Sequence, residues 1–313
     1  MLNYIARRLL LSIPTIIAVL TLVFVIARII PGDPALQMLG DNASAEALAS
    51  LRRRLGLDQP LYVQYFDFLF GVFRGDLGNS MVSGKPVLAE MLKVLPYTID
   101  LTVFAMVFGL LCGVPLGVIS AIYRNTVIDY GTRIVSLLGL SFPPFYMAML
   151  ILIIFAIYFN AFPVISSGDL SDPVQRLHHL ILPGVTLGLS VTAYITRVTR
   201  SSMLEVLQED FVRTAKAKGV PSLIIFLRHG LRNALIPVVT VAGLYFGLLI
   251  GNSVVIEIVF TRPGLGKMII GALDTRDYIM LQGLMVAYSL IVVLANLLTD
   301  LTYGWINPKV KYE

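Results

Sequence analysis

SSMLEVLQEDFVRTAKAKGVPSLIIFLRHGLRNALIP, residues 201–237, is a basic segment between two strongly apolar stretches of the chain. Gly219 and Pro221 interrupt it, and such residues punctuate helices, so the segment predicts two short helices joined by a turn. Lys and Arg are enriched in the cytoplasmic connections of membrane proteins. We therefore expect a cytoplasmic docking surface, with basic residues Arg213, Lys216, Lys218, Arg228 and Arg232.

Composition indicates one polytopic helical bundle rather than two soluble domains. The 313 residues are 57% hydrophobic and 14% charged, and the mean hydropathy is +0.83. The net charge of +5 does not indicate nucleic-acid binding, because the basic residues adjoin apolar runs instead of alternating with aromatic residues. The single cysteine, Cys112, lies in an apolar run, which excludes a disulfide framework and a thiolate metal site.

Six segments are long enough and apolar enough to cross the hydrocarbon core, which takes about 20 residues. The fourth is the shortest. The first has a longer apolar run than a signal peptide and no small-residue cleavage site after it, so we expect an uncleaved anchor. The six are approximately Leu9–Ile30, Thr98–Tyr123, Ile134–Phe159, Leu180–Ile195, Ala234–Ile256 and Ile279–Leu298.

The distribution of Lys and Arg orients these spans. With six crossings, the basic residues near both termini and those of the 201–237 segment fall on one side, which should be cytoplasmic. The long segment after the first span is then extracytoplasmic, with short helices near Ser44–Leu55 and Leu61–Phe73 that end at Gly56 and Gly75. The expected divisions are an N-terminal membrane helix (1–30), an extracytoplasmic helical loop (31–97) and a five-helix core (98–313) that includes the cytoplasmic loop (197–233).

The interiors of the second to sixth spans carry no Asp, Glu, Lys or Arg; Glu257 and Asp300 lie only near span ends. Ion-driven transporters keep buried ionisable groups or broken-helix ion sites, and channels show polar or charged rings. Transport against a gradient would therefore take its energy from another subunit. A structural membrane scaffold remains an alternative on composition alone.

Small residues at helical spacing predict close helix packing, within the chain or across a dimer. Prolines at Pro115, Pro183, Pro237 and in the pair Pro143–Pro144 predict bends or helix ends. The glycines at this spacing are Gly109, Gly113 and Gly117, then Gly184 and Gly188, then Gly243, Gly247 and Gly251.

No catalytic constellation is present in the sequence. The GLGK at Gly264–Lys267 is followed by Met268, where a phosphate-binding loop needs Ser or Thr. His178 and His179 are adjacent rather than at helical ligand spacing, so no metal site is expected. We expect that the chain is not an enzyme.

Several motifs together resemble the permease subunits of bacterial ATP-binding-cassette importers, in the branch that takes up dipeptides, oligopeptides, glutathione and nickel. The resemblance covers nearly the whole chain. Its motifs are MLNYIARRLL (1–10), PGDP (31–34), LGLDQPLYVQY (55–65), GDLGNS (75–80), TRSSMLEVLQEDFVRTAKAKG (199–219), LRHGLRNALIPVVT (227–240), RPGLGKMIIGALDTRDYIMLQG (262–283) and NPKVKY (307–312).

The resemblance implies that the cytoplasmic loop seats in a groove of an ATPase subunit. The sequence departs from the general Glu-Ala-Ala pattern of this loop, because Arg213, Thr214 and Ala215 stand there, although Gly219 keeps its place. This departure resembles the variant found in the peptide branch. The implied coupling residues are Glu209, Asp210, Arg213, Thr214, Ala215, Lys216, Lys218 and Gly219.

The resemblance further implies a type I importer fold in the bacterial inner membrane and an assembly with a homologous second permease, two ATPases and an extracytoplasmic binding protein. No cofactor is expected in this chain, since ATP and Mg would be bound by the ATPases. Short peptides are the leading solutes, followed by glutathione and then nickel. Candidates for lining the path are Ser141, Tyr146, Tyr245, Asn252 and Ser253.

Overall fold

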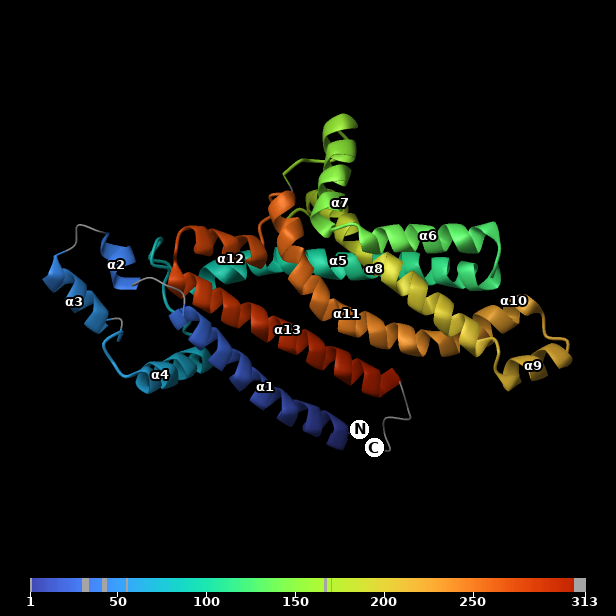
Figure 1. The fold of residues 1–313 in the computed structure, drawn as a ribbon, viewed down its shortest axis with the longest axis horizontal. Helices are drawn as coiled ribbons and strands as arrows, with labels where there is room; N and C mark the ends of the chain where they lie inside the picture. The colour runs from blue at the N-terminus through green and yellow to red at the C-terminus, as the bar shows by residue number, and fades with distance from the viewer. Residues whose placement is uncertain are drawn as a thin grey trace. The chain divides into compact units, whose positions relative to one another are not determined.

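The computed structural model is almost entirely helical (Figure 1). It describes all residues except 1, 30–33, 41–43, 55, 166–167, 170 and 307–313. In chain order the helices are α1 (Leu2–Ile29), α2 (Pro34–Leu39), α3 (Ala45–Arg54), α4 (Leu61–Arg74), α5 (Val87–Ile122), α6 (Val127–Ser141), α7 (Pro144–Ile151), η1 (Leu152–Tyr158), α8 (Pro173–Val206), α9 (Asp210–Ala217), α10 (Ser222–Ile224), η2 (Ile225–Leu231), α11 (Arg232–Val259), α12 (Leu265–Asp274) and α13 (Tyr278–Ile306), where η marks a π-helical segment.

The described residues form two compact units. One contains Tyr97–Pro263 together with the described residues of Met1–Ala6 and Ala295–Glu313, and the other contains Arg7–Pro96 together with Gly264–Leu294. Helices α1, α5 and α13 each contribute to both units. The first unit holds the larger buried core, built from α5, α7, η1, α8 and α11.

Helices α5 and α8 pack closely and in parallel. Gly109 faces Val191, Gly113 faces Ile195, and Gly117 faces Thr199, with the same sequence offset in every pair. A constant offset arises only when two helices run in the same direction. On the other side of the contact, Gly184 lies against Phe104 and Gly188 against Phe108. The predicted close packing of these glycines is confirmed, and the contact lies within the chain.

Because α5 and α8 are parallel, the chain between them must return to the level at which α5 begins. Helices α6 and α7 make this return with a bend of 105° between them. The bend predicted at Pro143–Pro144 is therefore confirmed, and it divides the expected span over Ile134–Phe159 into two helices. Phe142 and Pro143 both adopt extended backbone conformations ahead of prolines, as the steric demands of the pair Pro143–Pro144 require. Counted as one broken span, the pair brings the candidate spans to six.

Helix α11 runs antiparallel to α13. Gly243 contacts Thr299 and Gly247 contacts Asn296, so the residue numbers rise on one helix as they fall on the other. The hydroxyl of Thr299 also donates to the carbonyl of Gly243 at 3.1 Å. Gly251 has no described atom within 4 Å of an added Cβ, so the glycine motif of α11 is used only in part within the chain. Helix α11 itself continues through Pro237.

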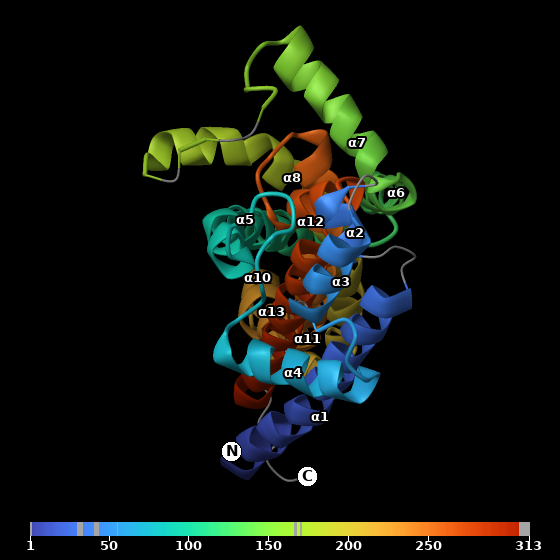
Figure 2. The same ribbon diagram turned by 90° about the vertical axis from the view of Figure 1, so that its left-hand side faces the viewer.

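The second unit confirms both helices predicted in the extracytoplasmic loop. Helix α3 matches the first, although Leu55 lies outside the described residues, and α4 ends at Gly75, which has a left-handed φ of 77°. The α4 residue Tyr65 joins α1 through a 2.6 Å hydrogen bond with Thr21 and an edge-to-face ring contact with Phe24. Figure 2 shows the same ribbon turned by 90°.

We predict that Gly113→Ala destabilises the first unit, because the new Cβ would lie 2.9 Å from both the Thr192 carbonyl oxygen and the Ile195 Cβ. Such overpacking costs about 1–3 kcal/mol. Gly251→Ala is the matched control, since it adds the same methyl group to open space. The unfolding midpoint of the complex in detergent should fall only for Gly113→Ala; equal midpoints would contradict the assigned α5–α8 contact.

Candidate functional site

The connection between α8 and α11 contains the predicted short helix, α9. Its Val212 is fully buried, which fixes the helix against the chain, while most of its other side chains are exposed. Gly219 has φ = 74°, and its N–H donates to the Lys216 carbonyl at 3.0 Å. The left-handed glycine therefore ends the helix, as the sequence predicts.

The second short helix of the loop is not a separate element. Residues from Ser222 onward form α10 and η2 and pass without interruption into α11, so one long helix covers Ser222–Val259. Pro221 precedes the first helical residue, and the helix continues past both Gly230 and Pro237. The expectation of two short helices joined by a turn is thus correct for the turn and for the first helix only.

The exposed face of α9 and its turn carries most of the candidate coupling residues. Ala215 lies one helical turn from the buried Val212 and is half-buried, whereas Ala217 is exposed. The ion pair between Asp210 and Arg213 is 3.5 Å long and solvent-exposed, so it contributes little stability. The candidates that are exposed are Glu209, Asp210, Arg213, Thr214, Lys216, Lys218 and Gly219.

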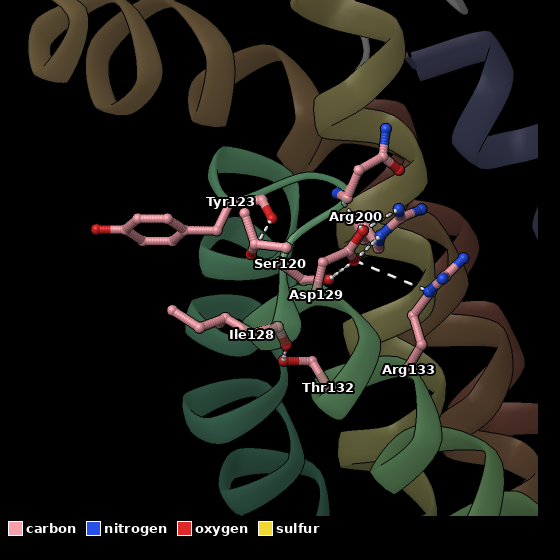
Figure 3. A network of polar contacts seen from close by, with 9 residues as sticks. Ser120, Tyr123, Ile128, Asp129, Thr132, Arg133 and Arg200 are labelled. Carbon is pink, nitrogen blue, oxygen red and sulfur yellow. Dashed lines mark hydrogen bonds and ion pairs between the residues drawn. The ribbon is translucent and has the colours of Figure 1, made fainter.

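The buried carboxylate of Asp129, at the start of α6, connects α6 to α5 and α8 (Figure 3). Asp129 is fully buried and accepts hydrogen bonds from Arg200 Nε at 2.7 Å and Arg200 Nη2 at 2.8 Å. It also accepts from the Ser120 hydroxyl at 2.6 Å and from the Asn125 N–H at 3.0 Å. The bidentate geometry satisfies both carboxylate oxygens.

The Asp129 network joins the last turns of α5, the start of α6 and α8. Helix α8 ends at Val206, four residues before α9 begins at Asp210. Arg200 lies six residues before the end of α8, and its contact with Asp129 connects this helix to α6, which leads into the 105° bend. Sequence reasoning missed this pair. The available signal was one carboxylate and one arginine, each just outside an apolar run.

A second ionic cluster lies at the opposite end of α5 and α8. Asp100 accepts from Arg176 Nε at 2.6 Å and lies 3.9 Å from Arg262 Nη2. Burial lowers the pKa of the Arg262 guanidinium, and the nearby carboxylates of Asp100 and Glu257 act in the opposite direction. Glu257, expected only near a span end, is fully buried and accepts from the Thr98 hydroxyl at 2.6 Å.

The five candidates for lining the translocation path lie in different environments. Ser253 is fully buried and donates to the Ile250 carbonyl. Tyr245 stacks on Tyr194 with ring centroids 5.0 Å apart, and Asn252 is half-buried. Ser141 and Tyr146 are exposed on either side of the bend. Their lining role stays a prediction.

Two adjoining cavities are found between α6 and α8. The larger has a volume of about 470 Å³ and the smaller about 240 Å³. Both are lined by Thr132, Ser136 and Thr196, so they lie next to each other, and we call the two together the α6–α8 groove. No group of three or more His, Cys, Asp or Glu side chains that could hold a metal is found among the residues that the structure describes.

Comparisons with known proteins bear on what this arrangement does. Residues 113–312 match the family "Binding-protein-dependent transport system inner membrane component", and residues 1–102 match the N-terminal family of the same membrane component. The chain is 42% identical over its full length to "Glutathione transport system permease protein GsiC" of Salmonella choleraesuis (strain SC-B67). It is 44% identical to the GsiC of Pectobacterium atrosepticum; in both cases all of each chain is covered.

A solved structure shows the same fold. A chain of the structure described as inward-facing conformations of the MetNI methionine ABC transporter superposes with a TM-score of 0.56 at 19% identity, covering 69% of this chain and 96% of that one. Together with the family matches over both parts of the sequence, this likeness establishes the type I importer fold. The chain belongs to the binding-protein-dependent transport family of inner-membrane components and is a multi-pass permease component of an ATP-binding-cassette importer.

Proposed function

We propose that the chain forms, with a homologous second permease, the import path for glutathione. Support for this solute comes from relatives of equal length whose printed name is glutathione transport system permease protein. Glutathione is itself a tripeptide, so this proposal narrows the short-peptide expectation and places the alternative solute first. Dipeptides or longer peptides come second and nickel third, since nickel prefers imidazole, thiolate or carboxylate ligands and no cluster of these is described.

Two ATPases and an extracytoplasmic binding protein complete the proposed assembly. Permeases of this family work with ATPase and substrate-binding partners. The exposed, mostly basic face of α9 supports docking of the ATPase there, because its backbone is fixed by the buried Val212 and by the glycine turn. ATP and Mg would be bound and hydrolysed by the ATPases, and this chain would contribute no catalytic group and no cofactor.

The six-crossing topology, with both termini in the cytoplasm, is part of the proposal. The parallel arrangement of α5 and α8 supports a crossing by α6 and α7 between them, with the turn between α5 and α6 on the same side as α9. In the second unit, Leu20 and Val23 of α1 pack with Val286 of α13, and Figure 1 shows these two helices antiparallel. The start of α1 and the end of α13 would then share a side, which the basic residues assign to the cytoplasm.

Cysteine labelling tests this topology. In a Cys112→Ala background, we expect Ala47→Cys and Ser171→Cys to react with an impermeant thiol reagent in intact cells. Val127→Cys and Ser222→Cys should react only after permeabilisation. All four positions are exposed. Labelling of positions 127 and 171 from the same side would show that α6 and α7 do not cross, and would reject the six-crossing arrangement.

The coupling role of α9 is tested by Ala217→Glu. The exposed position leaves the fold intact, while the acidic group places an unpaired charge in a close contact, so we expect at least tenfold weaker ATPase co-purification. Ala47→Glu, the same change on the exposed surface of α3, is the control. Normal ATPase association of both variants would place the docking surface elsewhere.

The variant Asp129→Asn tests the role of the Asp129–Arg200 pair separately from ATPase docking. Breaking a buried ion pair costs about 3–5 kcal/mol, but Asp129 is buried and is not part of the exposed face of α9. We expect ATPase association to persist while the solute imported per ATP hydrolysed falls, and the double change Asp129→Asn with Arg200→Gln to recover part of the lost stability. An unchanged transport stoichiometry in Asp129→Asn would contradict transmission through this pair.

Uptake by the reconstituted complex with its cognate binding protein tests the solute. We expect ATP-dependent, saturable accumulation of labelled glutathione. Excess unlabelled glutathione should abolish this uptake, whereas excess dipeptide or Ni²⁺ should leave more than half of it. Omission of the binding protein is the control. Saturable dipeptide uptake that glutathione does not inhibit would assign the chain to the peptide alternative instead.

A further inference from the structure

The α6–α8 groove has an apolar part and a cationic part. Val135 and Leu138 of α6, Phe142 at the bend, and Leu189 and Ala193 of α8 line its larger cavity. The smaller cavity is lined by Arg133, Arg197 and Arg200 together with hydroxyl side chains and two leucines. A groove with one apolar and one cationic end suits an elongated ligand with an anionic head and an apolar tail.

The positive charge at this end exceeds what the protein itself neutralises. Arg200 is engaged by Asp129 through two hydrogen bonds, and Arg133 Nε lies 4.0 Å from the same carboxylate. Arg197 forms no ion pair with any described carboxylate and packs over the Tyr194 ring, 5.5 Å from its centroid. Three guanidinium groups therefore line this cavity, and Asp129 is the one described carboxylate paired with any of them, which leaves a surplus of positive charge.

The two arginines other than Arg200 lie where apolar sequence ends on each helix. Arg133 immediately precedes the apolar run that starts at Ile134, and Arg197 comes two residues after Ile195, the last residue of the apolar run of α8. In a bilayer, this is the level at which hydrocarbon gives way to headgroups. A guanidinium at this depth can bind a phosphodiester through paired N–H donors.

We propose that the α6–α8 groove binds an anionic phospholipid of the inner leaflet, with the phosphate between Arg133 and Arg197 and an acyl chain along the apolar cavity. The assignment to the inner leaflet rests on the cytoplasmic placement in the proposed function. A lipid bound there lies beside the Asp129–Arg200 pair, which positions α8 ahead of α9. Anionic lipid would therefore favour the arrangement of α8 and α6 that the ion pair holds.

Photolabelling of the assembled complex tests the proposal. Phosphatidylglycerol with a photoreactive acyl chain is added to the complex in phosphatidylcholine nanodiscs, and the labelled peptides of α6 and α8 are quantified. Phosphatidylcholine with the same chain is the comparison. We expect labelling within 132–147 and 186–196 at several-fold lower concentrations of phosphatidylglycerol than of phosphatidylcholine.

Single variants locate the headgroup. Removing one basic residue from a lipid-facing surface weakens anionic-lipid binding about fivefold, so Arg133→Gln and Arg197→Gln should each shift half-maximal labelling by that factor. Arg124→Gln is the matched control, because Arg124 is exposed in the turn between α5 and α6 and lines neither cavity. Ser190→Phe, which adds a ring to the apolar cavity, should abolish acyl-chain labelling with the arginines intact.

Other occupants give other results. Competition by inorganic phosphate or by glutathione would assign the groove to a soluble anion, and cross-linking of α6 to the second permease without lipid labelling would assign it to that partner; either result overturns the proposal. Equal labelling by the two lipids, unchanged in Arg133→Gln and Arg197→Gln, does the same. Glutathione uptake separates the two proposals, because it persists if only the lipid site is wrong and is absent in every lipid if the proposed function is wrong.

Discussion

The parallel contact between α5 and α8 is the constraint on which the first unit depends. Lipid tails are as apolar as helix side chains, so burial alone gives membrane helices little reason to associate, and close backbone approach must provide the attraction. Five glycines provide it here along the two helices. The same contact requires the intervening chain to return as α6 and α7, and it provides the surface against which α6 and α11 pack.

Ionic networks fix this helix pair at both ends. Asp100, within α5, pairs with Arg176 in the first turn of α8, and Asp129 with Arg200 holds α8 against the end of α5 and the start of α6. With packed glycines between the two networks, α5 and α8 are suited to move as one body. The bend at Phe142–Pro143 lies outside this body, and the segment beyond it exposes many large apolar side chains. In sequence, the bent segment of α6 and α7 thus lies between the two helices of the rigid pair, α5 and α8.

Local sequence signals predicted much of the fold because they act over a few residues. Gly75 and Gly219 end helices as expected, since only a residue without Cβ adopts their left-handed conformation cheaply. Pro143–Pro144 bends the chain, but Pro183 and Pro237 do not interrupt their helices. Packing against neighbouring helices decides whether a proline bends its helix. The bend angle and the continuity of α10, η2 and α11 were therefore beyond sequence reasoning.

The site was predicted less completely than the fold, because local sequence signals do not show which distant residues come into contact. The α9 residues are contiguous, so family resemblance identifies them together, and the structure shows which of them are exposed. The ion pairs join residues far apart in sequence, and a lone Asp beside an apolar run looks like any solvated helix end. Hydroxyl-bearing and aromatic residues within spans gave no information on which face they occupy, and the structure buries Ser253 rather than exposing it.

The Asp129–Arg200 pair also places a requirement on the order of biogenesis. Asp129 leaves the ribosome 71 residues before its partner, after α5 and before α6, α7 and α8 are complete. Until α8 is inserted, the carboxylate has only neutral donors and Arg133 nearby and remains poorly compensated if buried. Chains truncated before Arg200 should therefore keep α5 and α6 loosely associated, in a form that membrane quality-control proteases can distinguish from the finished permease.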